Sequence, residues 1–223
     1  MQHADFLKIE FTGRIADTGQ VFDFTQAEVA RQEGILDPKK SYQPELVIIG
    51  AHMVIPGVEK QLLGMQDGEE RRFRLEPADG FGARNPRLVK VFSMTHFLKQ
   101  NISPVVGGYV HIEGLRGRIQ SVSGGRVRVD FNHPLAGKPL DYWVKVVAVV
   151  RDPAEKVKEL FAHFGVARET ALADKVLTVH GDVPEPEQQA IREMVLRWVK
   201  DVREVSFAPR AEPAKNSGVA KGI

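Results

Sequence analysis

The sequence predicts an α+β fold, and three observations support this class. Alternating apolar and polar residues, as in Glu70 to Glu76, are typical of strands with one face in water. Apolar residues recur at helical spacing in Glu155 to Phe164 and in Pro184 to Val202. A chain of 223 residues with 43% hydrophobic content can form one large domain or two to three small ones.

The first part of the chain is predicted to form strands separated by turns. The charged segment Glu28 to Ser41 is predicted to be a loop with a little helix. An apolar strand is expected to end at Val54-Ile55, because Pro56-Gly57 stops it and starts a short helix, Val58 to Leu63. The other predicted strands are Phe6 to Ile15, Val21 to Phe24, Leu46 to Ile49 and Glu70 to Glu76.

A small β domain is predicted at residues 87–129, inside a larger sheet. The Val-rich strand Leu140 to Val150 must pair with strands far earlier in the chain, so the residues between them form an independent unit. Within this unit, Ser123-Gly124-Gly125 lies between two alternating runs and predicts a hairpin. Ahead of the hairpin lies the apolar, Met-containing run Val91 to Leu98.

Residues 151–208 are predicted to form a C-terminal α+β domain in which no chemistry is recognised. Its two helices are accompanied by strands at Lys175 to His180 and Glu204 to Phe207. Trp198 lies on the apolar stripe of the second helix, where it either packs in the core or forms a self-association surface. Pro, Ala, Lys, Gly and Ser dominate residues 209–223, which predicts a disordered tail.

Composition excludes several classes of function. The chain has no Cys, which rules out disulfides, cysteine catalysis and zinc–thiolate sites and fits a reducing cytoplasm. The N-terminus lacks a signal-peptide pattern, and no stretch approaches the roughly 20 apolar residues that span a bilayer. We therefore expect a soluble, cytoplasmic protein without a membrane partner. The seven His residues show no ligand spacing, so neither a metal nor a cofactor is expected.

The charge is unevenly distributed, although the formal net charge is only +2. Residues 87–129 hold one acid, Glu113, against seven basic residues, which gives a net charge of +6. This excess is either a solvated surface or a surface that attracts acidic clients or ribosomal RNA. The basic residues are Arg87, Lys90, Lys99, Arg116, Arg118, Arg126 and Arg128.

Two segments, 53–86 and 131–140, predict an apolar concavity that lacks a nucleophile. Phe81 stands between two glycines, where the backbone bends freely and presents the ring. Neither segment contains a Ser-His-Asp set or a phosphate-binding loop. Hydrophobic walls can still catalyse rotation about an X-Pro peptide bond, because the transition state of that rotation is less polar than the ground state.

Five motifs in the chain resemble, in the same order, those of the FKBP-type peptidyl-prolyl cis-trans isomerases, specifically the SlyD-like branch and its longer archaeal relatives. They are Ile9-Glu-Phe-Thr-Gly13, Gly19-Gln-Val-Phe-Asp23, Val54-Ile-Pro-Gly57, Gly80-Phe-Gly82 and Asp130-Phe-Asn-His-Pro-Leu-Ala-Gly137. The resemblance implies an antiparallel β-sheet wrapped on a short helix, formed by residues 1–86 and 130–150. It also implies that residues 87–129 are an insert-in-flap chaperone domain that captures unfolded polypeptide.

The resemblance assigns roles to residues around a pocket for the proline-containing segment. Asp23 is the single carboxylate at the rim, and the backbone N–H of Ile55 holds the substrate carbonyl. The walls, floor and borders of the pocket are assigned to Phe11, Phe22, Val47, Val54, Ile55, Val58, Phe81, His133, Leu135 and Tyr142. Without the order of the motifs, Asp23 would be a turn residue and His133 a loop residue.

Two residues depart from the family pattern. Phe11 and Phe81 stand where many members have Tyr, so the Phe81 position offers no hydroxyl to the substrate carbonyl. Loss of one such hydrogen bond costs about 1 kcal/mol, so activity is expected to be reduced rather than abolished.

In the insert, the side chains expected to bind clients are Phe92, Met94, Phe97 and Leu98. The alternative is that they form the insert's own core. A domain this small buries little surface, so some of them are expected to stay exposed, and Met adapts to varied partners.

The sequence therefore predicts a peptidyl-prolyl cis-trans isomerase with chaperone activity. Its expected partners are unfolded or nascent polypeptides that contain X-Pro bonds, with ribosome association and a homodimer through the C-terminal domain as further candidates. One alternative is a chaperone that binds clients and has a degenerate isomerase pocket. Another is a nucleic-acid-associated protein that uses the basic insert.

Overall fold

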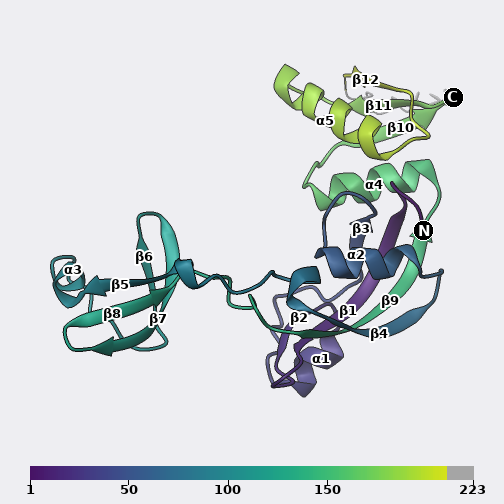
Figure 1. The fold of residues 1–223 in the computed structure, drawn as a ribbon. Helices are drawn as coiled ribbons and strands as arrows, with labels where there is room; N and C mark the ends of the chain where they lie inside the picture. Colours follow the sequence, from purple (N-terminus) through teal and green to yellow (C-terminus); the bar gives the residue numbers. More distant parts are fainter. Residues whose placement is uncertain (210–223) are drawn as a thin grey trace, which may run out of the picture.

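The computed structural model describes residues 1–209 and has an α+β fold with three separate sheets (Figure 1). Each sheet packs against its own cluster of buried apolar residues. The predicted α+β class is therefore confirmed. The tail predicted at residues 209–223 lies outside the described residues, apart from residue 209.

The largest sheet is antiparallel, has the strand order β2-β1-β9-β4, and carries β3 on the side of β1. Its strands are β1 (Phe6–Ile15), β2 (Val21–Phe24), β3 (Glu45–Ile48), β4 (Glu70–Leu75) and β9 (Leu140–Val150). Helix α2 (Pro56–Leu63) lies across one face of this sheet, and the short helix α1 (Ala27–Gln32) follows β2 (Figure 1). Val58 and Leu62 of α2 are buried against Leu7 and Val144 of the sheet. The predicted sheet wrapped on a short helix is thus confirmed.

Gly57 explains why the helix α2 can approach the sheet so closely. A Cβ atom at this position would lie 2.6 Å from the Leu75 Cδ2 atom and 2.7 Å from the Asp79 carbonyl oxygen. Because a backbone oxygen cannot swing aside, only glycine fits here. The contact holds α2 against β4 and against the 3₁₀ turn at Pro77–Asp79.

The strand predicted to end at Val54-Ile55 is absent, and this prediction was wrong. Strand β3 ends at Ile48, and the chain then turns through Gly50 and His52, whose φ angles are +90° and +53°. Residues in this left-handed conformation interrupt the extended backbone, so pairing cannot continue. Ile55 retains an extended conformation as the residue that caps α2.

The insert forms a four-stranded antiparallel sheet of order β5-β8-β7-β6, which stands apart from the rest of the chain (Figure 1). Its elements are β5 (Val89–Ser93), α3 (Met94–Leu98), β6 (Tyr109–Ile112), β7 (Leu115–Ser123) and β8 (Arg126–Asp130). The predicted hairpin between β7 and β8 is confirmed, with φ of +56° and +70° at Gly124 and Gly125. Both angles lie in the left-handed region that a tight hairpin turn requires.

Two segments connect the insert to the largest sheet, and they are bonded to each other. The Asn85 N–H donates to Asn132 Oδ1 at 2.8 Å, and the Asn132 side-chain amide donates back to the Asn85 carbonyl at 3.0 Å. Farther from the insert, the Gly137 N–H donates to the Gly82 carbonyl at 2.8 Å. A 3₁₀ turn at Pro86–Leu88 then leads into β5. These bonds fix the two connecting segments side by side.

The C-terminal unit lies at the other end of the molecule (Figure 1). It contains α4 (Pro153–His163), β10 (Glu169–Ala173), β11 (Val176–His180), α5 (Glu185–Trp198) and β12 (Glu204–Ala208). Its buried cluster includes Phe6, Leu46, Ile48 and Val150, so it packs directly on the largest sheet. Strand β10 was not predicted.

The predicted second helix is shorter in the structure than in the sequence analysis, because α5 ends at Trp198 rather than at Val202. Val199 leaves the helical conformation, with φ of −98° and ψ of 85°, and a turn then returns Val202 to the core. Trp198 is partly buried against this core and stacks on His3 with 5.7 Å between ring centroids. Within residues 1–209, no helix is long and apolar enough to cross a membrane.

Candidate active site

An aromatic cluster forms on the face of the largest sheet that α2 covers, and it unites four of the predicted site residues. The ring of Tyr142, on β9, lies 6.5 Å from that of Phe11 and 5.8 Å from that of Phe22, measured between centroids. Phe22 in turn meets Phe81 edge to face at 6.2 Å. Tyr142 also stacks on Phe73 of β4 at 5.9 Å, a contact that the sequence did not predict.

Gly13 makes room for this cluster. It pairs with Asp23 of β2 and with Tyr142 of β9. A Cβ atom on Gly13 would lie 2.6 Å from the Phe22 Cζ atom, so the Phe22 ring lies directly over the glycine. The glycine that ends the first motif and the Phe-Asp pair that ends the second therefore belong to one local structure. Their sequence spacing places an aromatic ring and a carboxylate at the same end of the sheet.

The aliphatic residues assigned to the pocket lie next to the aromatic cluster. Val47 and Val58 are buried in the same core, and Val54 and Ile55 are partly buried against it. The Ile55 carbonyl accepts hydrogen bonds from the first turn of α2. Its N–H has no hydrogen-bond acceptor among the described residues, so this donor is free for a ligand.

The loop between Phe131 and Lys138 supports the aromatic cluster from one side. The imidazole of His133 stacks on the Phe81 ring, with centroids 4.3 Å apart and planes inclined by 3°. His133 Nδ1 accepts a hydrogen bond from the Leu135 N–H at 3.2 Å, and Leu135 is buried. His133 therefore holds the Phe81 ring in place. From the sequence, His133 was expected only at the border of the pocket.

Asp23 lies at the exposed rim of the cluster, where its carboxylate accepts a hydrogen bond from the Phe24 N–H at 2.9 Å. Partial desolvation by its neighbours raises the pKa of Asp23, although the Phe24 hydrogen bond and the charge of Lys40 oppose the rise. Burial, together with the charge of Asp23, raises the pKa of the Tyr142 phenol. Tyr142 therefore remains a neutral hydroxyl, able to donate a hydrogen bond, at neutral pH.

Two further charged residues belong to this rim, and neither was predicted from the sequence. Burial raises the pKa of Glu45, at the start of β3, and the nearby Asp23 charge raises it further. The Lys40 ammonium lies 5.2 Å from the centroid of the Phe24 ring. Nothing in the local sequence pattern marks either residue: Glu45 reaches the rim through the pairing of β3 with β1, and Lys40 through the loop before β3.

The insert residues that were expected to bind clients divide into two groups. Phe97 has only 1% of its surface exposed and lies in the insert core, so its assignment as a client-binding residue is corrected to a core position. Phe92 and Met94 pack partly buried against that core. Leu98 is 59% exposed and remains accessible. The short helix α3 after β5 turns Phe97 toward the core and Leu98 toward solvent.

Other exposed apolar side chains of the insert were missed. Val105 and Val106 are 66% and 59% exposed in the loop before β6. Val91 of β5 and Leu115 of β7 are also exposed. The exposure of Val91 could have been predicted, because neighbouring residues of a strand point to opposite faces and Phe92 packs against the core.

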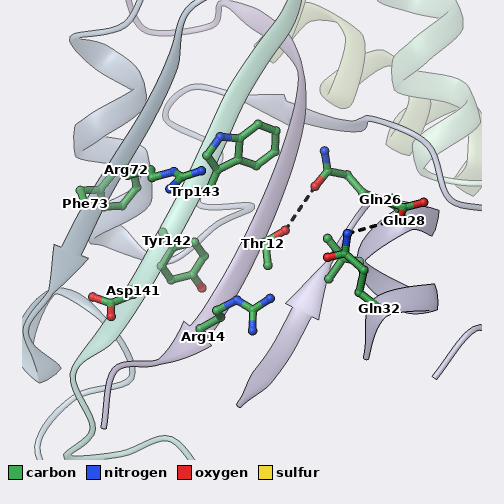
Figure 2. Close-up of a pocket in the computed structure, with 11 residues that line it drawn as sticks. Thr12, Arg14, Gln26, Glu28, Gln32, Arg72, Phe73, Asp141, Tyr142 and Trp143 are labelled. Atoms are coloured by element: carbon green, nitrogen blue, oxygen red, sulfur yellow. Dashed lines mark hydrogen bonds between the residues drawn. The ribbon is translucent and has the colours of Figure 1, made fainter. Parts of the chain in front are cut away.

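A groove of about 740 Å³ opens beside the largest sheet (Figure 2). The strands contribute to its lining, and the segment around α1 closes it; the strand residues are Thr12, Arg14, Arg72, Phe73, Asp141, Tyr142 and Trp143. Phe73 and Tyr142 therefore belong both to the aromatic cluster and to this groove. The groove is largely polar, and several of its charged groups have partners. Arg14 pairs with Glu33 at 2.9 Å, and Asp141 accepts from Arg74 at 2.8 Å. Most of its lining residues are polar or charged, so it offers a proline ring less apolar wall than the aromatic cluster does.

The part of the chain that the structure describes contains no group of three or more His, Asp or Glu side chains able to hold a metal ion. The aromatic cluster offers rings, aliphatic walls, one free N–H and two carboxylates at its rim, Asp23 and Glu45. This arrangement can bind and desolvate an apolar peptide segment without covalent chemistry.

Comparison with known proteins agrees with this site. Residues 90–135 match the family model described as "FKBP26, IF domain". A protein of Methanocaldococcus jannaschii named "Short-type peptidyl-prolyl cis-trans isomerase" is 32% identical over 155 residues, which cover 70% of this chain and 96% of that protein. The "FKBP-type 16 kDa peptidyl-prolyl cis-trans isomerase" of Escherichia coli is 33% identical over 137 residues, covering 59% of this chain and 85% of that protein. The SlyD protein of Helicobacter pylori, also named an FKBP-type isomerase, is 32% identical over 124 residues, 52% of this chain and 66% of that protein.

The chain therefore belongs to the FKBP-type peptidyl-prolyl cis-trans isomerase family, with SlyD-like relatives and an insert of the type found in FKBP26. The resemblance inferred from the five sequence motifs is confirmed.

Proposed function

We propose that this protein accelerates cis-trans isomerisation of X-Pro bonds in folding polypeptides, and that its insert captures those polypeptides. The single observation that carries the catalytic part is the aromatic cluster of Phe11, Phe22, Phe81 and Tyr142 beside the free Ile55 N–H. Family membership supports the same reaction.

Catalysis follows from the polarity of this cluster. The planar X-Pro amide is stabilised by conjugation, and rotation removes that conjugation and reduces the polarity of the carbonyl. Aromatic and aliphatic walls exclude water, so they favour the less polar, twisted state over the planar one. The Ile55 N–H holds the substrate carbonyl during rotation, and the neutral Tyr142 lines the wall. No bond to the protein is formed.

The capture function rests on the exposed apolar side chains of the insert. Leu98, Val105, Val106 and Leu115 are each more than half exposed, although they belong to a unit with a small core. Apolar groups on a small surface suit weak contacts with many unfolded segments. We therefore propose unfolded or nascent polypeptides as partners.

A protease-coupled assay on a short X-Pro peptide tests this function. The full chain should accelerate the cis-to-trans reaction, which takes tens of seconds or longer without a catalyst. If the chain suppresses aggregation of an unfolded protein but leaves the peptide rate unchanged, it acts only as a chaperone that binds its clients.

The missing hydroxyl at Phe81 gives a gain-of-function prediction. Phe81→Tyr adds a donor to a ring that His133 already holds in place. One hydrogen bond to the substrate carbonyl contributes about 1 kcal/mol, so kcat/KM should rise by up to about tenfold. The measurement is the peptide assay on both proteins, with thermal unfolding as the control. A slower enzyme of unchanged stability would show that no substrate carbonyl lies within reach of the new hydroxyl.

A further inference from the structure

A second cavity, of about 530 Å³, lies where the insert meets its two connecting segments. We call it the junction cavity. Its charged and aromatic lining residues come from both sides of the junction, and the main ones are Arg84, Tyr109, Arg116, Arg118, Phe131 and Lys138. The two connecting segments are bonded to each other, so the cavity has a fixed shape.

The junction cavity has an excess of unpaired positive charge. Its one carboxylate, Asp130, already accepts hydrogen bonds from Arg84 at 2.8 Å and from Gln120 at 2.9 Å. By contrast, Arg116 and Arg118 have no carboxylate partner within residues 1–209, and neither does Lys138. Three cations therefore face the cavity without a counter-charge from the chain.

Arg116 is held ready to bind an anion. Its guanidinium carbon lies 4.0 Å from the centroid of the Tyr109 ring, so the ring supports the guanidinium group. A guanidinium on an aromatic face keeps N–H donors at its edge free to bind a carboxylate in bidentate geometry. Tyr109 pairs with Arg118 across β6 and β7, which places the second guanidinium beside the first.

The basic surface continues beyond the cavity along the exposed face of the insert sheet. Arg126 and Arg128 alternate along β8 with the buried Val127 and Val129, so they lie on the outer face. The only acid within residues 87–129 is Glu113, in the turn between β6 and β7. The carboxylate on this face of β8 is Asp130, which Arg84 already binds, so the face keeps an excess of positive charge for a polypeptide that leaves the cavity.

The junction cavity is also connected to the candidate active site. His133 and Pro134 line the cavity, and the His133 ring stacks at 4.3 Å on Phe81 of the aromatic cluster. One loop thus forms a wall of both sites. A chain whose proline lies in the aromatic cluster can place its flanking residues in the junction cavity.

We propose that the junction cavity binds acidic segments that flank the proline, so that the protein prefers acidic polypeptide clients. This inference rests on the proposed isomerase function and adds a substrate class to it. Charge complementarity selects acidic chains, and the Tyr109 and Phe131 rings supply apolar contact for the peptide. The continuity with Phe81 favours a polypeptide over a nucleic acid as the occupant.

Three peptides test the proposal. They share one X-Pro core and carry flanks of Glu, Gln or Lys on both sides, and kcat/KM is measured by exchange NMR with the full chain. At low salt the Glu peptide should be isomerised about tenfold faster than the Gln peptide, chiefly through a lower KM, and the Lys peptide should be slowest. At about 1 M salt the three rates should converge, because the screening length falls to about 3 Å.

The variant Arg116→Glu/Arg118→Glu should bring the ratio of Glu-peptide to Gln-peptide kcat/KM to about one. Lys200→Glu/Arg203→Glu makes the same change in net charge in the C-terminal unit and should leave that ratio unchanged. If the glutamate variant fails to fold, Arg116→Ala/Arg118→Ala replaces it and should also lower the ratio.

The outcomes distinguish failure of the cavity proposal from failure of the proposed isomerase function. If the Gln peptide is isomerised and the Glu peptide gains nothing at low salt, the cavity proposal is wrong and the proposed function stands. If no peptide is isomerised, the proposed function itself fails. Retention of a homopolymeric RNA through Arg116 and Arg118, without any preference among the peptides, would assign the cavity to nucleic acid and overturn the proposal.

Discussion

Replacement of residues 87–129 by a short Gly-containing turn should leave isomerisation of a small neutral peptide nearly intact. The same variant should lose about a hundredfold in catalysis of a protein refolding reaction limited by proline isomerisation. The aromatic cluster lies outside the deleted region, whereas the insert raises the local concentration of client around it. The deletion is structurally feasible, because Val89 and Asp130 are direct neighbours across β5 and β8.

Both rates would be measured on the deletion variant and on the intact chain. A matched test keeps the insert and changes only its exposed apolar groups, for example Val105→Ser/Val106→Ser. Phe164→Ser, at an exposed position of the C-terminal unit, is the control. An equal decline of protein refolding and peptide isomerisation would show that the insert does not capture clients.

The second large effect concerns the aromatic cluster. Asp23→Ala and Tyr142→Ala should each lower kcat/KM on a short peptide by several-fold to about a hundredfold. Asp23 supplies the rim carboxylate, and Tyr142 contacts Phe11, Phe22 and Phe73 at once. Tyr142→Phe keeps the ring and removes the hydroxyl, so it separates the contribution of the apolar wall from that of the donor.

The neighbouring residue Trp143 provides the matched control. It follows Tyr142 on β9, so its side chain points to the other face of the strand. Both residues line the groove (Figure 2), but Trp143 has no contact with the rings of the aromatic cluster. Trp143→Ala should therefore leave peptide isomerisation unchanged. Loss of activity in Trp143→Ala, with full activity in both Asp23→Ala and Tyr142→Ala, would contradict the assignment. It would show that the site lies on the Trp143 face of the sheet.

Much of the fold could be predicted because the informative signals are local. The alternation of Val127 and Val129 with Arg126 and Arg128, next to two glycines, defines one face of a hairpin without any knowledge of the rest of the molecule. The break after β3 could not be predicted in this way. Val54 and Ile55 are as apolar as a strand, and only the left-handed residues before them end the pairing.

The residues of the candidate site could be predicted where the family motifs contain them. The contacts that arise only from packing could not be predicted. The cluster of Phe22, Phe81 and Tyr142 was expected as a set. The stacking of His133 on Phe81 depends on how a loop folds over the pocket, which no spacing in the sequence reports. Phe97 failed for a related reason, since a short apolar run cannot show which of its side chains turn inward.

Exchange NMR of one short, neutral X-Pro peptide with a small amount of the full chain tests the central claim most directly. The peptide signals report the rate of rotation about the X-Pro bond. The protein signals report which residues the peptide contacts. We expect cis-trans exchange much faster than the spontaneous process, which takes tens of seconds. We also expect shift changes in the protein centred on Phe22, Ile55 and Tyr142. Exchange at the spontaneous rate, or shift changes confined to the polar groove residues Thr12, Gln26 and Arg72, would contradict the account.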